Sequence, residues 1–301
     1  MTLERVPLRE TPVVAVPALG VVFKLESLQV TGSFKARGAW RRLAALTAGQ
    51  RARGVVAASA GNHGLGVAHA AGHLGIAATV VVPETAAAVK REGIERRGAR
   101  VIVDGATYDD AEASARRLAS DTGAVFVSPF DDDDVIAGNG GDLADELARQ
   151  VPDLRRVVCT VGGGGLIGGL GRALSPRGVT VIGAQPFANC AMFESLAAGR
   201  AFTTYTGGAT IAEGCEGAVC ERTFALARDH VDHIVRVDEA AIRRAVAFCY
   251  RTAGVVAECT AAVAVAALLE GEVRPADDGT TAVVITGGNI DAALLDSILA
   301  T

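Results

Sequence analysis

The chain has 301 residues, a formal net charge of -5 and 50% hydrophobic residues, which suffices for two domains or one large α/β domain. Aromatic residues make up only 4% and no basic patch is interleaved with them, so we expect no nucleic-acid partner. No apolar run approaches the roughly 18 residues of a membrane span, and residues 1–10 resemble no signal peptide, so we expect a cytoplasmic protein without membrane contact.

Apolar runs alternate with segments of helical periodicity along the chain. We expect strands at residues 21–25, 54–58, 78–83, 100–104, 124–128, 156–161, 179–184, 233–237 and 281–286. Strands rich in Val and Ile that are separated by helices are typical of parallel sheets built from βαβ units. In open sheets of this kind, ligands bind at the carboxyl ends of the strands.

A lysine lies among small residues in TGSFKARGA, residues 31–39. The chain uses lysine sparingly, because 26 of its 29 basic residues are arginines. An amine can lose its proton and attack a carbonyl carbon, whereas a guanidinium stays charged. Lys35 is therefore a candidate for amine chemistry, although this segment alone also fits a solvated loop charge.

Small and polar residues follow two of the expected strands, the one at 54–58 and the last one at 281–286. After the strand at 54–58 come Ser59, Ala60, Gly61, Asn62 and His63, where backbone N–H groups can approach an anion. Ser and Asn are also good helix caps, so a structural role fits the same residues. After the last strand, ITGGN puts the Thr286 hydroxyl at a strand end.

A run of four glycines in VGGGGLIGG, residues 161–169, lies between an expected strand and an expected helix. Such a run exposes backbone amides to a phosphate and is otherwise costly in conformational entropy, which favours phosphate binding. The loop also matches GxGxxG through Gly163, Gly165 and Gly168, so a dinucleotide-binding protein is the alternative from a different class. That alternative requires an acidic residue where the next strand ends, and this chain has Gln185 there.

Together these segments resemble the fold type II pyridoxal-phosphate (PLP) enzymes, most closely the serine/threonine dehydratase (ammonia-lyase) family. The resemblance runs in order through KLESLQVTGSFKARGA, SAGNHGLGVA, VVVPE, SPFDDDDVIAGNG, VGGGGLIGG, TIAEG and ITGGN. It implies an α/β fold with two domains, each with a mainly parallel open sheet flanked by helices, as in tryptophan synthase β. The implied parts are a large PLP-binding domain, residues 1–50 and 132–301, and a small mobile domain, residues 51–131.

The resemblance implies a role for each candidate residue. Lys35 matches the catalytic lysine that holds the cofactor pyridoxal 5'-phosphate covalently, and Phe34 packs beside the cofactor ring. Asn62 matches the asparagine on the ring hydroxyl, and Thr286 matches the residue that faces the pyridine nitrogen. The implied phosphate cradle consists of Gly162, Gly163, Gly164, Gly165 and Leu166. The implied substrate-carboxylate loop consists of Ser59, Ala60, Gly61, Asn62 and His63.

The implied reaction is PLP-dependent β-elimination from a hydroxy amino acid such as L-threonine or L-serine, which gives a 2-oxo acid and ammonia. An amino-acid racemase, or a lyase for another β-substituted amino acid, is the alternative within this fold. Racemases that resemble this chain carry a serine where Ala60 lies, and a methyl group cannot return a proton to the α-carbon. We therefore expect a lyase with little racemase activity.

The resemblance also implies an amino acid substrate and a homodimer. Some related racemases and dehydratases bind a divalent cation through a Glu, a carbonyl and an Asp, at positions that here are Gln185, Asn189 and Ala191. Because both carboxylates are missing, we expect no metal there. His69 and His73 have a spacing that can bind zinc, but no third ligand is evident, which favours a structural role.

Overall fold

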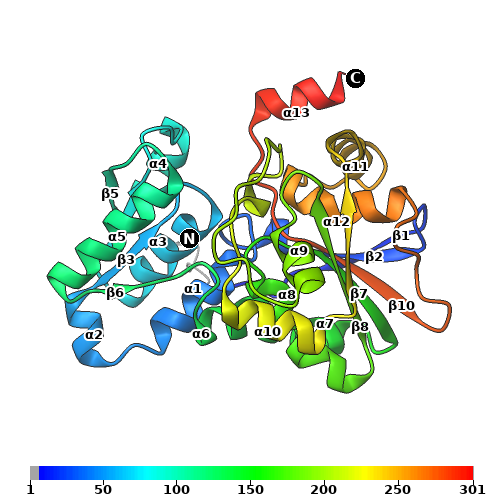
Figure 1. Cartoon of the computed structure of the whole chain (residues 1–301), viewed down its shortest axis with the longest axis horizontal. Coiled ribbons are helices and arrows are strands. Elements are labelled where there is room, and N and C mark those ends of the chain that lie inside the picture. The colour runs from blue at the N-terminus through cyan, green and yellow to red at the C-terminus, as the bar shows by residue number, and fades with distance from the viewer. Residues whose placement is uncertain (1–6, 301) are drawn as a thin grey trace, which may run out of the picture. The chain divides into compact units, whose positions relative to one another are not determined.

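The computed structural model describes residues 7–300, which form two compact α/β units (Figure 1). The smaller unit contains residues 7–9 and 34–139, and the larger unit contains residues 10–33 and 140–300. Each unit has its own sheet with helices packed against it. The expected class, α/β with mainly parallel sheets flanked by helices, is confirmed.

The smaller unit is built on a parallel four-stranded sheet. In spatial order, its strands are β5 (Arg100–Val103), β4 (Ala78–Val82), β3 (Val55–Ala58) and β6 (Val125–Phe126). Its helices are α1 (Lys35–Ala44), α2 (Ala48–Arg53), α3 (Asn62–Leu74), α4 (Ala88–Glu95), α5 (Tyr108–Thr122) and α6 (Asp133–Ile136). Ala57 shares a core with Val67 of α3, whereas its neighbour Ala58 shares another with Ala115 of α5. Both faces of β3 are therefore covered, which explains why the strand is apolar throughout.

The larger unit is built on a six-stranded sheet in which only β1 is antiparallel to its neighbour. In spatial order, its strands are β1 (Val13–Val16), β2 (Val21–Leu25), β10 (Thr280–Ile285), β7 (Leu154–Thr160), β8 (Thr180–Pro186) and β9 (His233–Val237). Its helices are α7 (Leu143–Gln150), α8 (Gly165–Leu174), α9 (Ala191–Ala198), α10 (Glu221–His230), α11 (Glu239–Arg251), α12 (Cys259–Leu269) and α13 (Ala292–Leu299). Short 3₁₀ segments occur at Glu26–Leu28, Ser175–Arg177 and Glu213–Cys215, and a π-helical segment occurs at Ala137–Asp142.

Helix α12 lies in the core of the larger unit, with every residue from Ala261 to Leu268 buried. It packs between the sheet and α11 and is apolar on all sides for that reason. Despite this composition α12 is short, and no helix within residues 7–300 combines the length and apolar character that crossing a membrane requires.

The pairing of β10 with β7 brings two expected site segments to one edge of the sheet. The two strands are parallel, with Ala282 opposite Val157 and Val283 opposite Val158. Because the carboxyl ends of parallel strands lie at the same edge, the loop after β7 and the residues after β10 both start there. Strand β8 runs parallel on the other side of β7 and ends at this edge too.

Most expected strands are found within one or two residues of their expected bounds, and two strands depart further from the expectation. Strand β1 is not evident from the sequence, because Pro12 and Pro17 flank its four residues and it pairs only with β2 at the sheet edge. Strand β6 covers two residues of the expected 124–128. The Val127 N–H still donates to the Val56 carbonyl of β3, but the Val127 carbonyl binds the His63 side chain of α3, so the ladder does not continue.

The two units also differ in extent from the expected domains of residues 1–50 with 132–301 and residues 51–131. Residues 34–50 lie with the smaller unit, because α1 packs closely on α3. A Cβ atom on Gly66 of α3 would lie 2.9 Å from the Lys35 carbonyl oxygen, so the two helix backbones touch at this glycine. The mobility of the smaller part stays a prediction.

Candidate active site

Lys35 is the first residue of α1, in the smaller unit. Its side chain is half-buried, and Nζ donates a hydrogen bond to the Pro129 carbonyl at 3.0 Å and lies 5.3 Å from the centroid of the Phe34 ring. The backbone N–H of Gly38, in the same first turn, donates to Asn139 Oδ1 at 2.8 Å. A Cβ atom on Gly38 would lie 2.6 Å from the Asn139 Cγ atom, so this turn is held tightly.

The loop between β3 and α3 carries the other candidates of the smaller unit. Ser59 Oγ accepts a hydrogen bond from the Gly61 N–H at 3.1 Å, which fixes the turn before α3 begins at Asn62. The residues from Ser59 to Asn62 are half-buried, so part of their surface stays accessible. A half-buried turn at a helix N-terminus can bind a carboxylate through its N–H groups.

His63 is buried and uncharged. Its Nε2 lies 2.9 Å from the Val127 carbonyl, which can only accept, so Nε2 carries the proton and Nδ1 is an acceptor. Burial, and then the nearby Lys35, lowers the pKa of His63 to about 3. Nδ1 is buried without a hydrogen-bond partner among the described residues. Lys35 and His63 thus bind carbonyls of one short segment, Val127 to Pro129.

The run of glycines lies between β7 and α8 in the larger unit. Gly164 has a φ of +89°, and a Cβ atom there would lie 2.5 Å from the Met192 Cε atom and 2.9 Å from the Thr223 Cβ atom. A Cβ atom on Gly162 would overlap the Gly214 carbonyl oxygen. These positions require glycine, and the resulting turn leads directly into the N-terminus of α8, where backbone N–H groups favour an anion.

Thr286 follows the last residue of β10 and is only 2% exposed. Its Oγ1 atom is buried without a hydrogen-bond partner in residues 7–300, and so is Oγ of the fully buried Ser33. The backbones of Ser33 and Gly287 pair as an isolated bridge, and the Gly287 carbonyl accepts from the Glu258 N–H at 3.0 Å. A buried hydroxyl without a partner is costly, and a ring nitrogen would satisfy it.

The residues of each unit, taken by themselves, fit different parts of pyridoxal phosphate. The smaller unit carries Lys35, Phe34 and the Ser59–His63 loop, and the larger unit carries the Gly162–Gly165 turn and Thr286. A turn that requires glycine at positions 162 and 164 fits the phosphate, a buried hydroxyl without a partner among the described residues fits the pyridine nitrogen, and a lysine amine fits the aldehyde.

Several groups in these segments carry no side-chain signal in the sequence. The carbonyl groups of Val127 and Pro129 accept hydrogen bonds from His63 and Lys35. In the sequence, SPFDDDD at residues 128–134 contributed to the family resemblance, but no residue there was given a role. Asn139 was likewise part of a resembling segment without an assigned role, although its contact with Gly38 fixes the turn that carries Lys35.

The two histidines with i, i+4 spacing bind backbone. His69 Nε2 donates to the Pro7 carbonyl at 2.8 Å, and His73 Nδ1 donates to the His69 carbonyl at 3.0 Å. The His73 ring also lies edge-on to Trp40, at 6.2 Å between centroids. Within the part of the chain that the structure describes, no three His, Cys, Asp or Glu residues are grouped so as to hold a metal ion.

Known proteins match nearly the whole chain. The family described as pyridoxal-phosphate dependent enzyme matches residues 5–287. The L-threonine ammonia-lyase of Thermotoga maritima is 44% identical over 283 residues, which is 93% of this chain and 69% of the relative. The catabolic L-threonine dehydratase TdcB of Staphylococcus aureus strain USA300 is 36% identical over 284 residues, which is 93% of this chain and 82% of the relative.

Solved structures agree with these sequence matches. The maize serine racemase superposes with a TM-score of 0.91 at 31% identity, over 97% of this chain and 92% of the other. The processed form of threonine deaminase isoform 2 from Solanum lycopersicum superposes with a TM-score of 0.90 at 30% identity, over 97% of this chain and 88% of the other. The expected family and cofactor are confirmed, and the dinucleotide-binding alternative is set aside. The chain therefore belongs to the pyridoxal-phosphate dependent enzymes, in the serine and threonine dehydratase family of fold type II.

Proposed function

We propose that this enzyme converts L-threonine or L-serine into a 2-oxo acid and ammonia by β-elimination. The observation that carries the proposal is the buried, unpartnered and uncharged hydroxyl of Thr286. A carboxylate at this place would keep the pyridine nitrogen protonated and so stabilise a delocalised carbanion. A neutral hydroxyl group does not hold the proton on the nitrogen in this way, so the carbanion is less stabilised. Expulsion of a β-hydroxyl group is therefore favoured, in agreement with the names of the relatives that act on L-threonine.

The other candidate residues bind the cofactor and the substrate and transfer the α-proton. The amine of Lys35 holds the cofactor and, once released, takes the α-proton of the substrate as a base. The Pro129 carbonyl, 3.0 Å from Nζ, offers the released amine a hydrogen-bond acceptor. The loop from Ser59 to His63 binds the substrate carboxylate through N–H groups other than those of Ser59 and Gly61, which donate to the Val81 carbonyl and to Ser59 Oγ. The N–H groups of Gly162 to Gly165 bind the phosphate. When bound, the cofactor supplies the electron sink for the charge released at the α-carbon.

The test uses purified protein incubated with pyridoxal phosphate. Wild-type protein should absorb in the visible range, lose this band on borohydride reduction with one modified lysine, and release ammonia and 2-oxo acid from L-threonine or L-serine. Lys35→Ala should lose the band and all turnover. The matched control is Lys90→Arg on α4, because Lys24 is fully buried and paired with Glu146. Full activity of Lys35→Ala would contradict the proposal.

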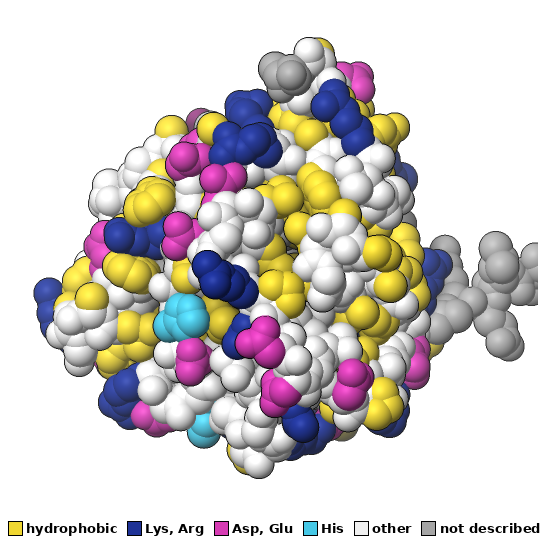
Figure 2. Space-filling view, turned by 90° about the vertical axis from the view of Figure 1, so that its right-hand side faces the viewer, with side chains coloured by type: hydrophobic (Ala, Val, Ile, Leu, Met, Phe, Trp, Pro, Cys, Tyr) yellow, Lys and Arg dark blue, Asp and Glu magenta, His cyan; other side chains and the backbone are white. Residues whose placement is uncertain are grey.

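We further infer a cytoplasmic homodimer with a mobile smaller unit. The larger unit exposes the large apolar residues Phe187, Tyr250 and Val256, which are 55%, 47% and 44% exposed. Figure 2 shows a face on which hydrophobic side chains gather between charged ones. Light scattering on a sizing column tests the dimer, and a mass of about one chain would contradict it.

A further inference from the structure

Gln185 occupies a buried position near the end of β8 and uses both ends of its amide. Nε2 donates to the Val161 carbonyl at 3.2 Å, and Oε1 accepts from the Phe193 N–H at 2.9 Å. The two partners fix which end is which, because a carbonyl only accepts and an N–H only donates. Gln185 is fully buried, so water does not compete for either bond.

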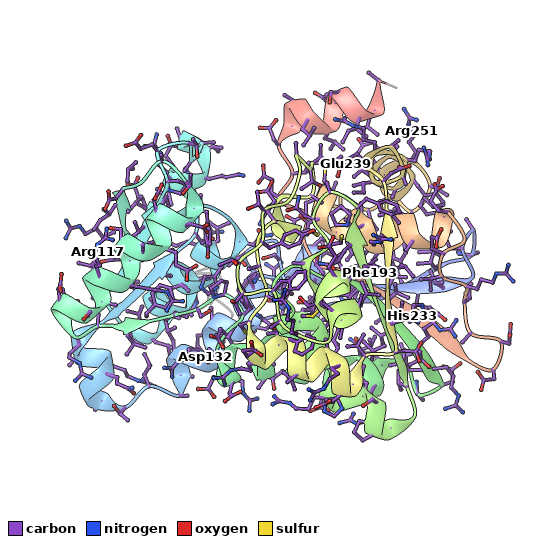
Figure 3. The ribbon with its side chains drawn as sticks, viewed as in Figure 1. Arg117, Asp132, Phe193, His233, Glu239 and Arg251 are labelled. Carbon is purple, nitrogen blue, oxygen red and sulfur yellow. The ribbon has the colours of Figure 1, made fainter. Side chains whose placement is uncertain are left out.

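Both partners of Gln185 adjoin the glycine turn. Val161 directly precedes Gly162, so the bond to its carbonyl fixes the point at which the turn begins. Phe193 is in the first turn of α9, which Figure 3 shows in the larger unit. The preceding residue, Met192, packs against the turn, since a Cβ atom on Gly164 would lie 2.5 Å from its Cε atom.

The backbone of β8 is close to the same segment. A Cβ atom on Gly183 would lie 2.7 Å from the Val161 Cγ2 atom and 2.8 Å from the Ile167 Cδ1 atom of α8. Gln185 therefore ties three elements together: the end of β7 through Val161, the start of α9 through Phe193, and its own strand. Four consecutive glycines lose much conformational freedom when they bind a ligand, so an anchor directly before them increases affinity by reducing that loss.

We propose that Gln185 is a positioning residue that preorganises the Gly162–Gly165 turn for the cofactor phosphate without a metal ion. The proposal rests on the proposed function, in which this turn binds the phosphate. A carboxylate at position 185 would place negative charge against the Val161 carbonyl oxygen and would need a cation between them. A neutral amide donates to that oxygen directly, so phosphate binding by this chain is independent of divalent metal.

The test measures how tightly the apo-enzyme binds pyridoxal phosphate and pyridoxal, which lacks the phosphate. Gln185→Met keeps a similar volume and removes both hydrogen bonds, and Gln185→Asn keeps an amide that is too short to make both. Each variant should bind pyridoxal phosphate roughly tenfold more weakly and pyridoxal as tightly as the wild type does. EDTA should leave the affinity of the wild type unchanged.

Ser195→Ala is the matched control. Ser195 is a fully buried residue of the same helix, where Oγ donates to the Ala191 carbonyl at 2.6 Å and accepts from the Phe202 N–H at 3.0 Å. Its loss should lower thermal stability and leave cofactor affinity unchanged. Three results would overturn the proposal. Ser195→Ala could weaken cofactor binding as much as the Gln185 variants do, or the Gln185 variants could fold and bind the cofactor as tightly as the wild type. The third result is loss of cofactor binding by the wild type in EDTA. Failure of the wild type to bind pyridoxal phosphate at Lys35 would instead overturn the proposed function.

Discussion

Thr286→Val should stabilise the apo-enzyme and weaken its hold on the cofactor. In the folded protein the Thr286 hydroxyl is 2% exposed and has no partner among the described residues. Burying a hydroxyl without a hydrogen bond costs about 1–3 kcal/mol in proteins, and a methyl group of nearly the same size does not incur that cost. We expect the variant to gain about 1 kcal/mol of unfolding free energy, which corresponds to a Tm rise of about 2–4 °C for a unit of this size.

The cofactor should respond in the opposite direction. When the pyridine nitrogen lies against Thr286, the hydroxyl regains a hydrogen bond worth about 1 kcal/mol. Its loss should raise the dissociation constant of pyridoxal phosphate roughly fivefold. Thermal unfolding of the apo-enzyme and an absorbance titration with the cofactor measure the two effects separately.

Thr281→Val is the matched control in the same strand. Thr281 is 1% exposed, and its Oγ1 accepts a hydrogen bond from the Ala276 N–H at 2.8 Å. Removing this acceptor leaves a buried N–H unpaired, so the control should lower stability by about 1–3 kcal/mol and keep cofactor affinity. If Thr286→Val destabilises the apo-enzyme as Thr281→Val does and binds the cofactor normally, Thr286 does not face the ring nitrogen.

Two further predictions concern the loop between β3 and α3. Ala60→Ser should raise the rate of D-isomer formation relative to ammonia release, because the loop gains a hydroxyl group while the Ser59 hydroxyl already accepts from the Gly61 N–H. Chiral analysis of the remaining substrate measures this ratio. Racemisation by the wild type at a rate that rivals ammonia release would contradict a lyase. Burial and the nearby Lys35 hold the pKa of His63 at about 3 instead of its ordinary 6.5. Between these two values the unfolded chain binds a proton that the folded chain does not. The free energy of unfolding therefore decreases as the pH is lowered from about 6.5, by at most about 1.4 kcal/mol per pH unit. His63→Asn should therefore lose less Tm than the wild type between pH 6.5 and 5, and an equal loss would show that His63 is not held neutral.

The sheets could be predicted from the sequence wherever a strand is covered on both faces. Residues 21–25 and 233–237 form strands with the expected bounds, because their runs of Val and Ile are long enough to be read without tertiary information. Strand β1 has the same kind of side chains but depends on pairing with β2, which no local pattern records. The end of β6 is set by the bond from His63 to the Val127 carbonyl, which is a contact between distant parts of the sequence.

Site residues with unusual backbone or chemistry were evident from the sequence, and those that act through backbone were not. Gly164 is identified by the run of four glycines, and the structure gives the reason, since its φ of +89° and its contacts admit no side chain. Lys35 is identified because lysine is rare in this chain. The Pro129 carbonyl near Lys35 could not be identified, since every residue has a carbonyl group. In the sequence Gln185 was identified only as the residue that replaces an expected acid. Its two hydrogen bonds could not be predicted, because they depend on how α9 packs near the end of β8.

These contacts have a common consequence for the chemistry of the site. Thr286 presents a hydroxyl, His63 a neutral imidazole, and the Gly162–Gly165 turn presents backbone amides, so among the residues assigned to cofactor and substrate only Lys35 carries a charge that can change. Backbone amides and the N-terminus of α8 can neutralise a phosphate without any titration of their own. The groups that the protein presents to the cofactor phosphate therefore keep the same charge as the pH changes. Since the pKa of His63 lies near 3, a change of turnover between pH 6 and 9 reports the amine of Lys35 and the ionisation of the bound substrate and cofactor, rather than a side chain that holds them.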